Sequence, residues 1–507
     1  MNSNKLILKN SIILYVRLIV TSIVGLLVSR FVLQNLGVSD FGLYSVVGGV
    51  VSLMVFLNTV MISTTYRFIA FEMGRGNDIG INKVFNISLV THISIVFLII
   101  LMAESIGRWY VFNKLNVEVG RVDDAFFVFR MSILATIFNI FSIPYQGLLT
   151  AKEKFSVIAF VEITKSILIL ALVSMLFIYN GDKLRLYAIL MAFVTFIYSL
   201  LFIIYCRRNY HEQVRWLFQK DKNKYIEMLK YSGWIMFGAA SSVGQVQGSA
   251  LLINSFFNTA LNTSFGIANQ VNLFLKMFAG NLGQAVVPQI TKSYSGGNHK
   301  RTEELVFYTG KYVFFLVLIS GIPIFLEAEY LLQLWLGVVP EYAVTFTQLM
   351  IIKAILDSLR SGITQVIHAT GKIKWFQIIL SSTMLLSLPI AYIFFKFGYE
   401  PYIILVIILC IGVFNTILRL IMLKIIVNFN VLKLLKVSYL KILYVSLSTF
   451  PLFYINDFID PGFARFTCSV FLSVLYILVS IYLLGIEKRE REILKYRLSL
   501  LFKSQNK

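Results

Sequence analysis

The stretch EYAVTFTQLMIIKAILDSLRSGITQVIH, residues 341–368, predicts a membrane-spanning helix that carries charge. Its ionisable and polar side chains include Lys353, Asp357, Arg360, Thr364 and His368. They recur every three or four residues, so on one continuous helix they share a face about 80° wide. Because ionisable groups are costly in hydrocarbon, this face should meet other protein or a wet cavity. Two interpretations are open: an ion-pair network that joins helices, or a cavity wall that binds an anion.

The composition of the whole chain is that of a membrane protein. Mean hydropathy is +0.79, 58% of the residues are hydrophobic and 14% are charged. Apolar runs of about 20 residues recur from end to end, each long enough to cross about 30 Å of hydrocarbon. We therefore predict an all-α polytopic membrane protein. A β-barrel would instead show short segments of alternating hydrophobicity.

The apolar runs define about fourteen transmembrane helices. They lie at approximately 10–33, 41–65, 83–103, 123–149, 156–179, 185–205, 231–257, 263–290, 304–326, 341–369, 376–396, 402–427, 438–456 and 463–484. Alternate connections and helix ends hold 30 of the 46 Lys and Arg residues, the opposite side holds seven, and nine lie within spans. The positive-inside rule then predicts that both termini are cytoplasmic, so the net charge of +21 reflects topology and anionic headgroups, not nucleic acid.

The spans fall into two groups of six and one of two. The predicted parts are an N-terminal six-helix lobe (1–205), a basic cytoplasmic linker (206–230), a C-terminal six-helix lobe (231–427), two appended transmembrane helices (428–484) and a basic cytoplasmic tail (485–507). Phe-Gly pairs open the second and eighth spans, 224 positions apart, and basic motifs follow the fourth and tenth spans. These matches predict two repeated lobes around a central cavity.

Several other polar residues within spans are candidates for the wall of that cavity. The cationic candidates are Arg17, Arg30, Lys276, Lys353 and Arg360, and Asp357 is an acidic candidate. The amide candidates are Gln245, Asn254, Asn269 and Gln270. Arginines near helix ends can also extend toward the headgroups. Amides can join membrane helices by hydrogen bonds or can bind sugar hydroxyls. Each alternative is open from the sequence.

The sequence shows no catalytic, metal-binding or cofactor-binding motif. The four histidines form no HExxH pattern, and no Walker A loop is present. The three cysteines are far apart, which indicates neither a disulfide framework nor a zinc site. The longest outer loop, 104–122, is too short for a catalytic domain. We expect a protein that is not an enzyme and uses no cofactor or metal.

Motifs along the chain resemble a known family. Arg30, the nearby Leu36-Gly37 and Asp40-Phe41-Gly42, and Arg67-Phe68 resemble the opening of polysaccharide flippases of the multidrug/oligosaccharidyl-lipid/polysaccharide exporter superfamily. The residues 145–151 (YQGLLTA) and 369–372 (ATGK) resemble two of its span junctions. The drug-exporting branch usually carries an acid in its first span, and the span at 10–33 has none.

The resemblance implies transport of undecaprenyl-pyrophosphate-linked oligosaccharide repeat units across the bacterial inner membrane, for O-antigen, capsule or exopolysaccharide biosynthesis. We expect alternating access by a monomeric transport unit surrounded by membrane lipids, with a proton or sodium as a possible coupling ion and no nucleic acid partner. Cavity cations would then offset the pyrophosphate charge. The alternatives are a peptidoglycan lipid-precursor flippase, a drug/cation antiporter of the same superfamily, and a membrane enzyme such as an O-antigen polymerase.

Overall fold

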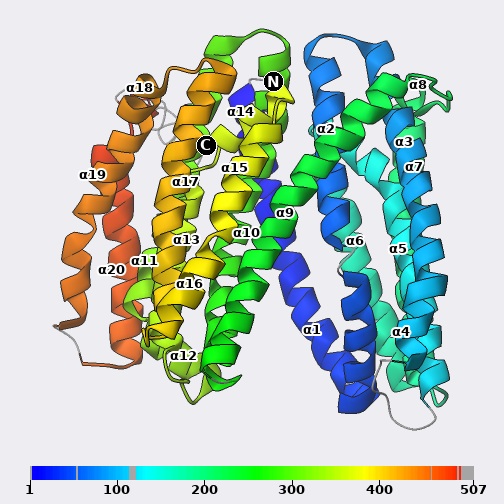
Figure 1. Ribbon diagram of the computed structural model, residues 1–507, viewed down its shortest axis with the longest axis horizontal. Coiled ribbons are helices and arrows are strands. Elements are labelled where there is room, and N and C mark those ends of the chain that lie inside the picture. The colour runs from blue at the N-terminus through cyan, green and yellow to red at the C-terminus, as the bar shows by residue number, and fades with distance from the viewer. Residues whose placement is uncertain are drawn as a thin grey trace, which may run out of the picture. The chain divides into compact units, whose positions relative to one another are not determined.

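The described part of the chain is built from helices and their connections. The computed structural model (Figure 1) describes residues 3–52, 55–113, 121–257, 259–457, 460–487 and 490–492. No strand occurs in these ranges. The predicted all-α polytopic membrane fold is confirmed. Most of the predicted tail, and the tip of the longest outer loop, lie outside the described residues.

The helices follow one another through short connections. The first are α1 (Ser3–Ser52), α2 (Val55–Gly74), α3 (Asp78–Met102), α4 (Arg108–Asn113), α5 (Val122–Ala151), α6 (Phe155–Ser174), α7 (Lys183–Asn209) and α8 (His211–Val214). The next are α9 (Lys222–Phe256), α10 (Thr259–Ser295), α11 (His299–Leu326), α12 (Ala328–Leu336), α13 (Ala343–Ser358), α14 (Ile363–Thr370), α15 (Lys374–Leu385), α16 (Ser387–Lys396) and α17 (Ile403–Val427). The last are α18 (Val431–Leu434), α19 (Leu440–Ser448) and α20 (Phe463–Ser480).

Nine helical segments of the described residues are long and apolar enough to cross a membrane. Other predicted spans fall on helices that are interrupted, such as α13 and α14, or rich in amides, such as α9 and α10. Breaks and polar side chains are tolerated at membrane depth where protein or a wet cavity covers them. The span count from hydropathy therefore exceeds the number of uninterrupted apolar helices in the described ranges.

The chain divides into two compact units. Unit 1 comprises Met1–Ala239 and Val287–Asn298, and unit 2 comprises Ala240–Val286 and His299–Lys507. In unit 1, α5 packs against α2 and α7, and α1 packs against α6. In unit 2, α13 packs against α11 and α17, and α15 also packs against α17. The lobe boundaries drawn from the sequence stay predictions.

The two C-terminal helices belong to unit 2 and pack on α11, as Figure 1 shows at the edge of that unit. An apolar cluster joins Phe315 and Leu318 of α11 to Val445 of α19 and Ile477 of α20. Fully buried Lys311 extends this contact. Its Nζ lies 2.8 Å from a carboxylate oxygen of Glu490, which follows α20. Apolar contacts of α19 and α20, and the ion pair of Glu490, therefore hold the C-terminal helices against α11.

The helix predicted over 341–369 is not continuous, which corrects the sequence prediction. Helix α13 ends at Ser358 and α14 begins at Ile363. Gly362 has a φ of 83°, a conformation outside the right-handed helix. A Cβ at this glycine would lie 2.8 Å from the carbonyl oxygen of Val306 on α11, so the break also allows two backbones to approach closely.

The break divides the predicted polar face. Lys353 and Asp357 stay on α13 and Arg360 lies in the turn, whereas Thr364 and His368 belong to α14. His368 Nε2 lies 3.3 Å from the amide nitrogen of Gln377 on α15. A shared face over all five residues required an unbroken helix, so that part of the prediction is wrong.

Candidate functional site

A cluster of three cations surrounds one carboxylate in unit 2. Lys353 Nζ donates a hydrogen bond to Asp357 Oδ2 at 2.7 Å, because residues four apart are neighbours on a helix. Lys276 Nζ of α10 lies 3.6 Å from the same oxygen. An Arg360 guanidinium nitrogen lies 3.7 Å from Asp357 Oδ1. We call these four residues the α13 charge cluster.

The charge cluster keeps a surplus of two positive charges and is incompletely buried. Relative exposures of the side chains are 16% for Lys353, 20% for Asp357, 33% for Lys276 and 42% for Arg360. A single carboxylate cannot neutralise three cations, and the incomplete burial leaves room for another anion to approach. This is the electrostatic character expected of an anion-binding surface.

A cavity of about 60 Å³ adjoins the charge cluster. Besides the cluster, its lining includes Gln245 of α9 and both Asn415 and Arg419 of α17. A volume of this size, lined by several polar groups, can hold a few water molecules. The cluster therefore borders a polar space inside unit 2.

Helix α17 supplies functional candidates that the sequence-based selection did not include. Arg419 lines the cavity, and its buried Nε has no hydrogen-bond partner among the described residues. One turn away, buried Asn415 accepts a hydrogen bond of 2.6 Å from Thr383. The signal was present: an Asn and an Arg four apart on an otherwise apolar helix lie on one face.

The predicted amides do not gather around the charge cluster as a group. Gln245 lines the cavity, but its Nε2 donates at 3.0 Å both to Met384 O and to Ser387 Oγ. Asn254 is exposed and Asn269 is half-buried. Gln270 lines a different hollow of about 440 Å³, beside the aromatic residue Trp335. Gln245 thus joins helices, as the structural alternative proposes for amides.

The predicted arginines of the first span lie in unit 1. Arg17 pairs with Glu162 of α6 at 3.0 Å. On the same helix, Lys165 Nζ lies 4.5 Å from the ring centroid of Tyr198. Arg30 is exposed on α1, three residues after exposed Leu27, a position that fits the headgroup alternative. The structure thus places these arginines in a unit separate from the α13 charge cluster.

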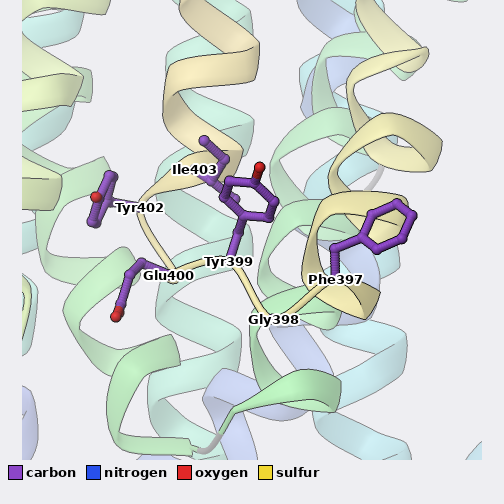
Figure 2. Close-up of a pocket in the computed structure, with 6 residues that line it drawn as sticks. All are labelled: Phe397, Gly398, Tyr399, Glu400, Tyr402 and Ile403. Atoms are coloured by element: carbon purple, nitrogen blue, oxygen red, sulfur yellow. The ribbon is translucent and has the colours of Figure 1, made fainter.

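Another hollow, of about 390 Å³, lies at the loop between α16 and α17. Figure 2 shows Phe397, Tyr399 and Tyr402 spreading from this loop in different directions. Glu400 accepts a hydrogen bond from the Tyr342 hydroxyl. Exposed aromatic rings are typical of the ends of membrane helices, where one side is apolar and the other is wet. None of the predicted site residues lines this hollow.

Metal chemistry finds no support in the described ranges. They contain no group of three His, Cys, Asp or Glu side chains that could hold a metal ion. The α13 charge cluster itself is dominated by cations, which would repel a metal ion. The surplus of positive charge in the cluster favours an anion over a cation as its counter-charge.

Several solved structures share the fold of this chain. A MATE structure in the bent conformation has a TM-score of 0.73 and 16% identity, over 87% of this chain and 98% of that one. An outward-facing multidrug resistance MATE family transporter of the MOP superfamily gives 0.72 and 15%, over 86% and 98%.

A third structure is a MOP superfamily transporter from Pyrococcus furiosus, with a TM-score of 0.68 and 14% identity, over 84% of this chain and 96% of that one. For that transporter, the reverse polarity of the binding pocket suggests a different function. No protein-family model matches the sequence, and no curated protein matches it. The chain has the fold of MATE transporters of the MOP superfamily.

Proposed function

We propose that the protein is a flippase for undecaprenyl-pyrophosphate-linked oligosaccharide repeat units, embedded in a bacterial inner membrane with both termini cytoplasmic. The observation that carries this proposal is the α13 charge cluster. Three cations share one carboxylate beside a polar cavity, and a pyrophosphate is the kind of anion that such a site would bind. The fold supports a membrane transporter and leaves the substrate open.

The proposed role of Asp357 is that of a resident counterion. In the absence of substrate it neutralises part of the charge of Lys353, Lys276 and Arg360. When a pyrophosphate enters, the cations exchange some of their contacts with Asp357 for contacts with phosphate oxygens. Such an exchange limits the cost of keeping cations at membrane depth without substrate.

The competing function is a drug/cation antiporter, because a multidrug resistance transporter is among the structures with this fold. The charge cluster disfavours a cationic substrate, since its surplus of two positive charges would repel one. A reconstituted system can separate the two functions. Purified protein in vesicles should move a fluorescent undecaprenyl-pyrophosphate oligosaccharide to the opposite leaflet and should leave a cationic dye where it is.

Variants test whether flipping depends on the α13 charge cluster. Lys353→Gln should slow flipping by roughly 10- to 150-fold, the equivalent of losing about 1.5–3 kcal/mol of a hydrogen bond to a charged group. Lys372→Gln, at an exposed lysine outside the cavity, is the matched control and should flip normally. Transport of the dye, or equal activity of the two variants, would refute the proposal.

A further inference from the structure

A hydrophobic and basic segment of the connection between α7 and α9 is held with its side chains outward. Residues 215–220 read RWLFQK. Exposed fractions are 53% for Trp216, 48% for Leu217 and 64% for Phe218. Three consecutive large apolar side chains in water forgo much of the stabilisation that burial provides. A surface this apolar at a helix connection indicates contact with another phase or molecule.

Buried amides of α3 fix the backbone of this segment. Asn82 Nδ2 donates to the carbonyl oxygens of Glu212, Gln213 and Arg215 at 2.9, 3.1 and 2.9 Å. Asn86 Nδ2 donates to the same Arg215 oxygen at 3.0 Å, and Asn86 Oδ1 accepts from the Leu217 nitrogen at 3.2 Å. These hydrogen bonds hold one side of the segment's backbone against α3. The apolar side chains lie on the other side, so the fold itself keeps them exposed.

The attachment lies near the start of α3, where the charged end of the helix gives way to a long uncharged run. Lys83 pairs with Asp221 at 2.6 Å and marks the charged end of α3. From Val84 to Ala103 the chain carries no Asp, Glu, Lys or Arg. At 1.5 Å per residue, Asn82 and Asn86 lie about 6 and 12 Å along the helix from Asp78. The segment is therefore held at the charged end of α3, and a membrane-spanning helix places such an end near the headgroup layer.

The charges around the segment match phospholipid headgroups. Its own ends are Arg215 and Lys220, and exposed cations on either side include Arg207, Arg208 and Lys222. The acids between these cations are Glu212 and Asp221, of which Asp221 is paired with α3. Aromatic rings flanked by cations are favoured at membrane surfaces, where the rings enter the interface and the cations meet phosphates.

We propose that residues 215–220 form an interfacial anchor that binds anionic phospholipids with Arg215 and Lys220 while Trp216 and Phe218 enter the headgroup region. The anchor holds the α7–α9 connection on the bilayer at the same depth as the start of α3. It does not depend on which substrate the protein moves, nor on which side of the membrane the connection faces.

Fluorescence of Trp216 tests the anchor. A variant with Phe in place of Trp109, Trp234, Trp335 and Trp375 retains this one tryptophan. Reconstituted in phosphatidylcholine vesicles with phosphatidylglycerol, it should be quenched about twofold more by lipids brominated near the headgroup than by lipids brominated near the chain end, and should be shielded from aqueous iodide. Removing phosphatidylglycerol should weaken the quenching by brominated lipid.

Two further variants separate attachment from charge. Replacing Asn82 and Asn86 by Ala should release the segment and expose Trp216 to iodide, in protein whose melting temperature confirms that it is folded. Replacing Arg215 and Lys220 by Gln should abolish the effect of phosphatidylglycerol, whereas Lys372→Gln should not. Full iodide access with no quenching by either brominated lipid would overturn the proposal. Protection of Trp216 in native membranes, together with iodide access in vesicles, would overturn it in favour of a protein partner.

Discussion

Asp357→Asn should destabilise the protein much more than Lys353→Gln, because the three cations share a single acid. Without Lys353, Asp357 still has Lys276 at 3.6 Å and Arg360 at 3.7 Å. At an effective dielectric constant of about 20, each such contact is worth about 4–5 kcal/mol before desolvation. Arg360 is 42% exposed, so solvent screens most of its share.

The expected losses in the free energy of unfolding differ because one acid serves three cations. Lys353→Gln removes one contact and leaves a compensated acid, which should cost about 1–2 kcal/mol. Asp357→Asn leaves three cations facing one another, which should cost about 3–5 kcal/mol. Thermal or denaturant unfolding in a single detergent, run on both single variants and the double variant, gives the coupling between the two sites.

Flipping assays in vesicles on the same three variants separate the effect on stability from the effect on transport. The double variant should be more stable than Asp357→Asn, yet flipping should stay as slow as in Lys353→Gln, because a ligand for pyrophosphate has been lost. Equal destabilisation by the two single changes would refute the shared-counterion geometry. A double variant that regains near wild-type flipping would show that the cluster is only an ion-pair network.

Three further predictions concern the stability of the protein and of the connection between α7 and α9. Glu490→Gln should cost about 3–5 kcal/mol in unfolding experiments, because it removes the carboxylate that pairs with fully buried Lys311; no loss would show that this pair is unimportant. Gly362→Ala should cost more than Gly398→Ala, since both have positive φ but only Gly362 has a carbonyl oxygen in the space of the new Cβ; equal losses would contradict this. A hydrogen bond from a lysine of α3 lowers the pKa of Asp221 below its usual 3.8. The ionised Asp221 therefore stabilises the folded connection fully above pH 3.8, and this stabilisation is lost as the pH falls through the lower pKa of the folded state. Protease cleavage of the connection should therefore stay slow near pH 3.8 and accelerate only below it; acceleration centred above 3.8 would contradict this.

The sequence by itself determined the class of fold and one local pair. Long apolar runs require helices in a bilayer, because backbone polar groups cannot stay unpaired in hydrocarbon. Lys353 and Asp357 meet because they lie four residues apart on one helix. Both conclusions depend on interactions within one helix or between a helix and its solvent. Neither requires knowledge of which helices are neighbours.

Tertiary structure alone decided the rest of the site. Lys276 reaches Asp357 across 81 positions of sequence, and Arg419 joins the same cavity from α17. The break at Gly362 removed Thr364 and His368 from the predicted face, because α11 approaches the backbone there too closely for a side chain. Hydropathy and helical periodicity carry no information on such long-range contacts, since helix packing is set by the matching of surfaces that are distant in sequence.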